Sequence, residues 1–277
     1  MTPQFFTTSL LPKPESLLLR GGDRRKILPL RVRVGYFQHP ALGHTLIDCG
    51  YGGHIGKRQP GEGPLLPLYR MMLQPSALDA NPIRTGLARL GLHPKQIDTV
   101  VITHFHADHV GGLNEVPQAK VLTSKKAWQA VTHKTQLSLA MEGVFRNLLP
   151  ADLKSRLRFI DDCAQHEAPL GLGTGWDITG DGAILAVDLP GHLQGHFGLC
   201  FDEPARDAPF LYAVDAQWLP QAIIEDRCPG FPARMVHHNA RDTDHTVHRI
   251  RAFAKRGGDF LLCHGPCLHP FDCDRDV

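Results

Sequence analysis

Three observations predict that this sequence folds as a single α/β domain. Apolar segments typical of strands alternate with segments of helical periodicity from about residue 32 to residue 264. Neither an internal repeat nor a linker rich in glycine, serine or charged residues divides the 277 residues. The composition, 42% hydrophobic and 21% charged, is that of a globular protein that buries a substantial core. We expect residues 1–277 to form one domain, with 1–30 as an N-terminal extension and 266–277 as a C-terminal tail.

The first predicted elements are a β-hairpin and a long loop. Residues 32–37 and 44–48 have the apolar, β-branched composition of strands, and residues 39–43 between them are rich in turn formers. A glycine-rich segment follows at residues 51–63, before an apolar run at residues 65–73. Long loops in compact domains are often functional, so this segment is a candidate lid or rim.

The remaining elements continue the alternation of helices and strands. Pro82 and Gly91 bracket a helix at residues 83–90, because proline favours the first turn and glycine the position after the end. The β-branched run at residues 97–103 is typical of a buried strand, and it ends beside His104. The same patterns predict strands at residues 120–122, 183–189, 197–201, 210–214 and 260–263, and helices at residues 125–131, 136–149 and 243–256.

Charge and cysteine content exclude several classes of protein. A formal net charge of +2 gives no general attraction to nucleic acid or to an anionic membrane. Seven cysteines, an odd number without a Cys-x-x-Cys pair, do not indicate a disulfide framework. The first 22 residues are interrupted by prolines and charges, unlike a signal peptide or a membrane-spanning segment. We therefore expect a cytoplasmic monomer or homodimer that acts on a small molecule, with no nucleic acid or membrane as partner.

Histidine is over-represented, and its distribution predicts a metal site. The chain has 17 histidines against four tyrosines and three tryptophans, and histidine is the commonest metal ligand. A His-x-His-x-Asp-His run occupies residues 104–109, directly after the predicted buried strand. So many polar side chains at one strand end need partners that a cation would supply. Loop geometry would let His104 and His106 converge on one ion while Asp108 and His109 turn toward a second.

Three further candidate ligands each follow a predicted strand. His192 comes after the strand at 183–189, Asp215 after that at 210–214, and His264 after that at 260–263. Ligands gather at the carboxyl ends of strands in α/β sheets, so residues distant in sequence meet there. Imidazole and carboxylate donors around two divalent ions suit Zn²⁺ best, and they also accept Fe or Mn.

In these motifs the sequence resembles the metallo-β-lactamase-fold hydrolases, from about Val32 to Pro266. The matching segments occur in that family's order: residues 46–50, 104–109, 190–192, 214–215 and 263–265. The resemblance implies an αβ/βα sandwich of two mixed β-sheets flanked by helices, with a dinuclear site along one edge. It further implies that His104, His106 and His192 hold one metal, that Asp108, His109 and His264 hold the other, and that Asp215 bridges them.

Within that superfamily the pattern is most similar to the N-acyl-homoserine lactonase-like group. Asp215 at the bridging step is unlike the true β-lactamases, which carry Cys or Ser there. His106 stands where flavodiiron oxygen reductases carry Glu. One departure concerns Trp218, which replaces the tyrosine that the lactonase group carries three residues after the bridging aspartate. The phenolic donor to the lactone carbonyl is therefore absent from this position.

These features predict a hydrolase of small esters or lactones, acyl-homoserine lactones included. A metal-bridging hydroxide would attack the carbonyl, and Asp108 would carry the proton to the leaving alkoxide. The same chemistry suits a phosphodiesterase or organophosphate hydrolase, with Arg234 and Arg241 as candidate basic residues, or a glyoxalase II-type thioesterase. The non-enzymatic alternative is a metal-binding scaffold or sensor in a biosynthetic or signalling pathway.

Other residues near the motifs have predicted supporting roles. Asp48 and His196 are expected to orient the ligands through hydrogen bonds. The candidates for a substrate pocket are the aromatic residues Trp218, Phe105 and Tyr51.

The remaining histidines and cysteines are expected to have no role in the site. His237 and His238 lie close to further histidines, but no partners complete a third metal site, so a solvated loop is favoured. We expect Cys263 to be a small buried hydrophobe. Cys267 and Cys273 would belong to the frayed tail.

Overall fold

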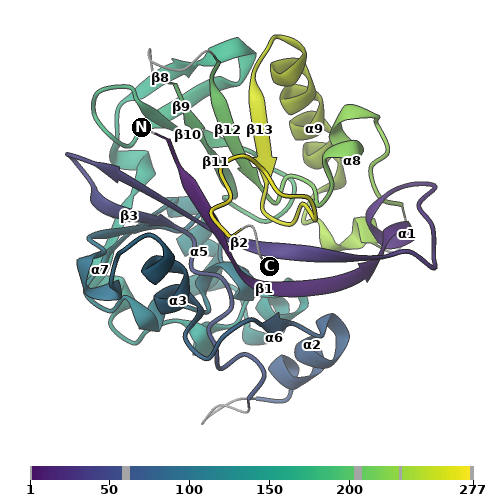
Figure 1. Cartoon of the computed structure of the whole chain (residues 1–277), viewed down its shortest axis with the longest axis horizontal. Coiled ribbons are helices and arrows are strands. Elements are labelled where there is room, and N and C mark those ends of the chain that lie inside the picture. Colours follow the sequence, from purple (N-terminus) through teal and green to yellow (C-terminus); the bar gives the residue numbers. More distant parts are fainter. Residues whose placement is uncertain (1, 58–62, 203–207, 231–232, 275–277) are drawn as a thin grey trace.

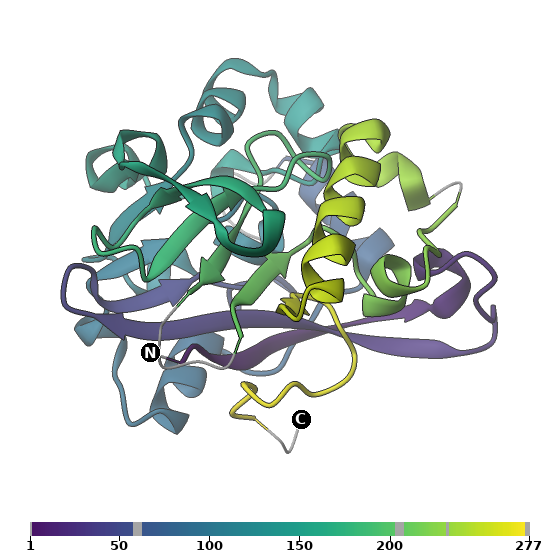
Figure 2. The same cartoon turned by 90° about the horizontal axis from the view of Figure 1, so that it is seen from above.

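Two β-sheets pack face to face, and helices cover both outer faces (Figures 1 and 2). This arrangement is seen in a computed structural model that describes residues 2–57, 63–202, 208–230 and 233–274. The first half of the chain supplies one sheet and the second half supplies the other. The predicted αβ/βα sandwich of two mixed sheets is confirmed.

The first sheet has seven strands in the order β4-β1-β2-β3-β5-β6-β7 among the described residues. A long antiparallel ladder joins β1 to β2, and β3, β5, β6 and β7 run parallel to one another. The strands are β1 Gln4–Pro14, β2 Ile27–His39, β3 Gly43–Ile47, β4 Ser76–Ala77, β5 Thr99–Val101, β6 Lys120–Thr123 and β7 Leu157–Phe159.

The second sheet has six strands in the order β13-β12-β11-β10-β9-β8 in the part of the chain that the structure describes. Its pairs are antiparallel except for β12 with β13. The strands are β8 Gln165–Ala168, β9 Gly173–Asp177, β10 Ile184–Asp188, β11 Phe197–Phe201, β12 Phe210–Val214 and β13 Asp259–Leu262.

Helices flank both sheets. Helices α8 and α9 cover the second sheet through Ile223, Ile250 and Phe253, and α2, α3 and α5 pack on the side of the first (Figure 1). The α-helices are α1 Glu15–Leu18, α2 Leu65–Leu73, α3 Pro82–Arg89, α4 Ala107–Val110, α5 Lys125–His133, α6 Gln136–Met141, α7 Leu153–Arg156, α8 Pro220–Ile224 and α9 Ala240–Lys255. Short 3₁₀ turns, among them η3 Arg146–Leu148, complete the connections.

An aromatic-rich core lies between the two sheets. The ring of Phe5 on β1 packs on Phe210 and Tyr212 of β12, with ring centroids 6.2 and 4.7 Å apart. Phe37 on β2 meets Phe201 on β11 edge-to-face at 5.7 Å. Burying each such side chain contributes about 1.5–3 kcal/mol, so this layer holds the sheets in fixed register and with them the strand ends that carry the site.

The two ends of the chain belong to the domain, which corrects the prediction of an extension and a tail. Residues 4–14 form β1 inside the first sheet, where Phe5 and Phe6 are fully buried. The backbone N–H of Thr7 donates to Asp274, and the carboxylate of Asp272 is buried against Arg33. Pro12 and Pro14 stand near the end of β1, where a strand tolerates proline. Residues 275–277 of the predicted tail lie outside the described residues.

Some predicted elements differ in extent. The helix predicted at 136–149 ends at Met141, because Gly143 adopts a left-handed φ of +74° and turns the chain. Strands β8 and β9 were not predicted, since β8 is mostly exposed and β9 carries two glycines, so neither shows an apolar alternation. Of the candidate lid at 51–63, residues 58–62 lie outside the described residues.

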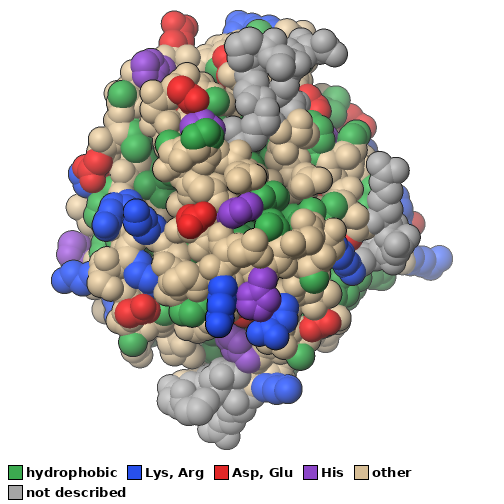
Figure 3. Space-filling view, turned by 60° about the vertical axis from the view of Figure 1, so that its left-hand side comes forward, with side chains coloured by type: hydrophobic (Ala, Val, Ile, Leu, Met, Phe, Trp, Pro, Cys, Tyr) green, Lys and Arg blue, Asp and Glu red, His purple; other side chains and the backbone are tan. Residues whose placement is uncertain are grey.

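The surface carries no single dominant charge on the face shown in Figure 3, where basic and acidic side chains are interspersed. This distribution agrees with the small net charge of +2. None of the described helices has the length and apolar character to cross a membrane.

Candidate metal centre

The seven predicted ligands come together at one edge of the sandwich. Asp215 follows β12 directly, and His264 and His192 follow β13 and β10 within a few residues. The run at 104–109 begins just after β5 and turns into helix α4. All seven side chains are buried: His104, His106, Asp108, His109, His192, Asp215 and His264.

Three imidazoles converge in the first ligand group. Nε2 of His104 and Nε2 of His192 each lie 3.0 Å from Nδ1 of His106. A single ring nitrogen has one lone pair and cannot accept two hydrogen bonds from these neighbours. Burial lowers the pKa of His106 to about 3 and that of His192 to about 4, so both rings are neutral, as metal ligands must be.

The second ligand group contains His109, Asp215, Cys263 and His264, whose donor atoms lie within 4.8 Å of one another. Asp108 lies beside it, with Oδ2 3.3 Å from Nε2 of His264. Cys263 was expected to be only a buried hydrophobe, and its Sγ does donate to the carbonyl of Arg33 at 3.6 Å. Its proximity to the other three donors is a feature that sequence reasoning missed.

Asp215 stands between the two groups. Its Oδ2 lies 3.1 Å from Nε2 of His264 and 3.3, 3.5 and 3.9 Å from the Nε2 atoms of the other imidazoles, which belong to His192, His109 and His104. Although burial alone would raise it, His264 and His109 hold the pKa of Asp215 well below its usual range. The preceding residue, Val214, has a φ of +52°, and this left-handed turn at the strand end directs the carboxylate into the site.

Hydrogen bonds to Asp48 and His196 hold two of the predicted ligands, His109 and Asp215, in position. Asp48 accepts from the backbone N–H of Thr103 at 2.9 Å, and its Oδ2 lies 2.8 Å from Nδ1 of His109. Nδ1 of His196 donates to the carbonyl of Leu189, and its Nε2 accepts from the backbone N–H of Asp215 at 3.3 Å. The structure therefore gives Asp48 and His196 contacts of the kind expected for residues that orient ligands.

Three buried atoms of the predicted ligands have no hydrogen-bond partner among the described residues: Nε2 of His109, Nδ1 of His192 and Oδ1 of Asp215. Leaving a buried polar atom unpaired costs about 1–3 kcal/mol, so such atoms are rare without a ligand. These atoms, once the imidazoles are neutral, and the convergent nitrogens around His106 are donors of the kind that divalent cations bind. The types of donor atom and their lack of other partners are therefore those expected of a metal centre.

Comparison with known proteins agrees with this geometry. Residues 32–207 match the family described as "Metallo-beta-lactamase superfamily". The chain belongs to this superfamily. Membership makes it a metal-dependent hydrolase, as predicted, and implies divalent metal binding.

Within this superfamily, several of the proteins most similar to this chain are lactonases. An N-acyl homoserine lactonase AttM of Azorhizobium caulinodans is 26% identical over 242 residues, covering 84% of this chain and 81% of that protein. Among solved structures, a B. thuringiensis AiiA variant with N-decanoyl-L-homoserine at its active site has a TM-score of 0.68 at 17% identity, over 95% of this chain and 93% of that one. AidC, a dizinc quorum-quenching lactonase, has a TM-score of 0.64 at 12% identity, over 94% and 86%. The resemblance to the lactonase group is confirmed.

Two tyrosines lie beside this metallo-beta-lactamase centre. The hydroxyls of Tyr51 and Tyr69 are hydrogen-bonded at 2.7 Å, and burial, with the Asp108 carboxylate, raises the pKa of both well above the ordinary value. Both phenols therefore stay neutral. Tyr51 was predicted to line a pocket and is instead fully buried; Tyr69, on α2, was missed because nothing in the local pattern places it near the ligands.

Phe105 and His237 occupy different surroundings from those predicted. The ring of Phe105 is 1% exposed and packs against Trp128 in the core on the helix side, so it presents no surface to a substrate. His237 was expected in a solvated loop but is 7% exposed and stacks on Trp218 at 5.4 Å. Burial lowers the pKa of His237 to about 4. His238 is exposed, as expected.

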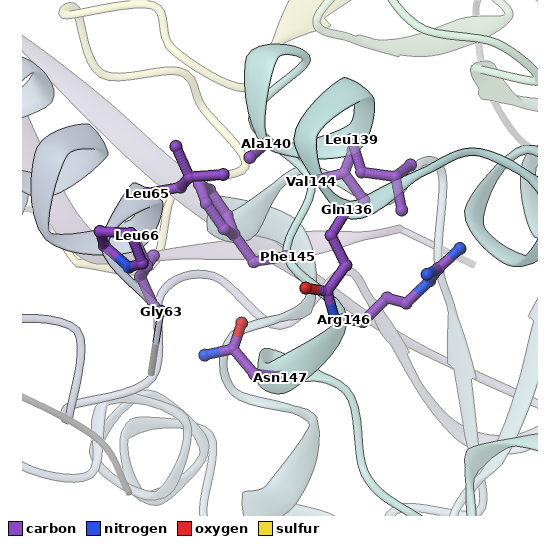
Figure 4. Close-up of a pocket in the computed structure, with 11 residues that line it drawn as sticks. Gly63, Leu65, Leu66, Gln136, Leu139, Ala140, Val144, Phe145, Arg146 and Asn147 are labelled. Carbon is purple, nitrogen blue, oxygen red and sulfur yellow. The ribbon is translucent and has the colours of Figure 1, made fainter. Parts of the chain in front are cut away.

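An apolar pocket of about 130 Å³ lies between α2 and the end of α6 (Figure 4). Tyr69 lies between this pocket and Tyr51: its ring meets Phe145 of the pocket edge-to-face at 5.0 Å, and its hydroxyl bonds to that of Tyr51. Arg146 and Asn147 mark its polar side (Figure 4). Its apolar lining consists of Pro64, Leu65, Leu66, Leu139, Ala140, Val144 and Phe145.

Metal binding to the metal-free protein is expected to release about two protons at pH 7. Against the effect of burial, Asp48 raises the pKa of His109, and Asp215 that of His264, well above the ordinary value, so both rings start protonated. Bound metals require them neutral, so metal affinity should fall as pH falls. Calorimetric titration with Zn²⁺ in buffers of different ionisation enthalpy measures the number of protons released. Release of no protons would contradict the charge state assigned to these rings.

Proposed function

We propose that this chain is a dinuclear zinc lactonase that opens the ring of N-acyl homoserine lactones. The observation that carries the proposal is the position of Asp215, one of whose oxygens lies 3.1–3.9 Å from imidazoles of both ligand groups. A shared carboxylate between two sets of imidazoles suits a pair of Zn²⁺ ions once every ring is neutral. The lactonase relatives and the dizinc enzyme AidC support the same substrate and metal.

Bound metals would supply a water of lowered pKa and polarise the carbonyl. The chain's own residues supply the rest. Against the effect of burial, His109 and His264 lower the pKa of Asp108 to about 2 in the metal-free chain, so this carboxylate is ionised. We assign it the transfer of that proton to the ring oxygen as the ester bond breaks. Beside the centre, the hydroxyl of the fully buried Tyr51 is hydrogen-bonded to that of the half-buried Tyr69.

The surroundings favour an apolar acyl substituent over a phosphate group. The pocket between α2 and α6 offers leucine, valine and phenylalanine side chains to an acyl chain. Arg234, a candidate phosphate-binding residue, is engaged by Asp244 at 2.6 Å, and Arg241 lies exposed on α9. We therefore rank the lactone above a phosphodiester.

A turnover screen with metal analysis tests the proposal. The zinc-loaded protein is expected to bind two equivalents of metal and to hydrolyse N-hexanoyl homoserine lactone with kcat/KM of at least about 10⁴ M⁻¹ s⁻¹. A thioester and a phosphodiester are measured beside it, and the His106→Ala variant shows the background rate. Faster hydrolysis of either of the other two substrates, or one metal per chain, would reject the assignment.

A further inference from the structure

His237 is a buried imidazole without a hydrogen-bond partner. It is 7% exposed, and neither Nδ1 nor Nε2 has a partner among the residues that the structure describes. A histidine that only supports a core satisfies at least one ring nitrogen, as His196 does with Leu189 and Asp215. A bound ligand could therefore supply the hydrogen-bond partner that the ring of His237 lacks.

Its position beside the metal centre is fixed by the backbone. The N–H of His238 donates to the carbonyl of His192 at 3.0 Å, and the N–H of Asn239 donates to the carbonyl of Gly191 at 3.0 Å. Asn239 in turn caps helix α9. The ring of His237 consequently lies 5.5 Å from that of the proposed ligand His192, centroid to centroid, and stacks on Trp218 with centroids 5.4 Å apart.

A structural water could form a hydrogen bond with only one of the two ring nitrogens of His237. Behind the ring is a cavity of about 10 Å³, which it shares with Gln217, whose side-chain amide also has no partner. A cavity of this size holds at most one water, and that water can bond to one ring nitrogen and to the amide. The second ring nitrogen is left for a ligand. Among the described residues, neither group of clustered metal-ligating side chains includes His237, so a third metal is not indicated.

We propose that His237 binds substrate by donating an N–H hydrogen bond to the oxygen of the carbonyl under attack. The inference rests on the proposed function, because it names a residue of that same site. A neutral, buried imidazole beside the centre is a donor held in place by its neighbours, and such donors act most strongly when negative charge develops on the oxygen. The effect should therefore be on kcat more than on KM.

Two substitutions at this position test the assignment, with His238→Phe as a control on the exposed neighbour. His237→Phe is expected to lower kcat for N-hexanoyl homoserine lactone by about 10²–10³-fold, with KM within about threefold and both metals retained. His237→Gln keeps an N–H donor and should recover at least about tenfold of the loss. Calorimetry should show weaker binding of the product N-hexanoyl-L-homoserine to His237→Phe. The control should match the wild type in every measurement.

Thermal unfolding of the metal-free proteins separates a binding role from a structural one. Because phenylalanine replaces a buried polar ring without partners, metal-free His237→Phe should have a Tm equal to or above the wild type's. A fall of several degrees, a loss of metal, or an unchanged kcat would each overturn the proposal. If the wild type hydrolyses only a thioester or a phosphodiester, the lactonase assignment is wrong but the role of His237 is not yet contradicted. The rates of the same variants are then compared on that substrate. If it hydrolyses none, unchanged product binding by His237→Phe overturns the inference.

Discussion

Asp215→Asn is expected to lower lactone hydrolysis by at least about 10³-fold and to leave fewer than two bound metals per chain. Oδ2 of Asp215 is 3.1 Å from His264 and 3.3 Å from His192, which belong to different ligand groups. An amide carries no negative charge to hold two cations together. It would also place an N–H₂ group among imidazole nitrogens that need to face metal. Steady-state kinetics and elemental analysis measure the two effects.

Two further Asp→Asn variants show whether the effect at Asp215 is specific to that position or follows from any loss of a negative charge. Asp48→Asn weakens the hydrogen bond to His109 without removing a ligand, so it should cost only about 10–100-fold. Asp202→Asn, at an exposed position after β11, should match the wild type. Two tightly held metals in Asp215→Asn, with a rate within tenfold of the wild type's, would show that another group joins the metals.

Arg33→Met is expected to lower the Tm by roughly 10 °C, the largest effect on stability that we predict. Nε and Nη2 of Arg33 donate to the two carboxylate oxygens of Asp272, both at 2.8 Å, and both side chains are 0% exposed. Nη1 donates to the carbonyls of Cys263 and Gly265 on either side of the ligand His264. Removing one partner strands a buried charge, at a cost of about 3–5 kcal/mol.

The double variant Arg33→Met with Asp272→Leu checks this explanation. It removes both buried charges, so it should recover more than half of the lost Tm. Arg84→Met, at an exposed position on α3, serves as the control and should shift the Tm by less than about 2 °C. A double variant as unstable as Arg33→Met would locate the loss in packing and in the carbonyl contacts.

The local pattern predicted most of the strands and the seven residues that we propose as metal ligands. The run at 104–109 follows a β-branched strand, and the motifs with His192, Asp215 and His264 each follow an apolar segment. Strand ends can be read from a few neighbouring residues, and the sheet then brings them to one edge. For this reason the sequence by itself determined the fold class, the superfamily and the candidate metal ligands.

Tertiary structure alone decided which side chains surround those ligands. Thr7 meets Asp274 across 267 positions in the sequence, and Arg33 meets Asp272 across 239, so no local pattern could join the ends of the chain to the domain. The approach of Tyr69 to the centre and the burial of His237 likewise depend on how separate segments pack. Burial and unpaired hydrogen-bonding atoms are properties of the assembled fold, because they depend on every neighbour in space and not on adjacent residues.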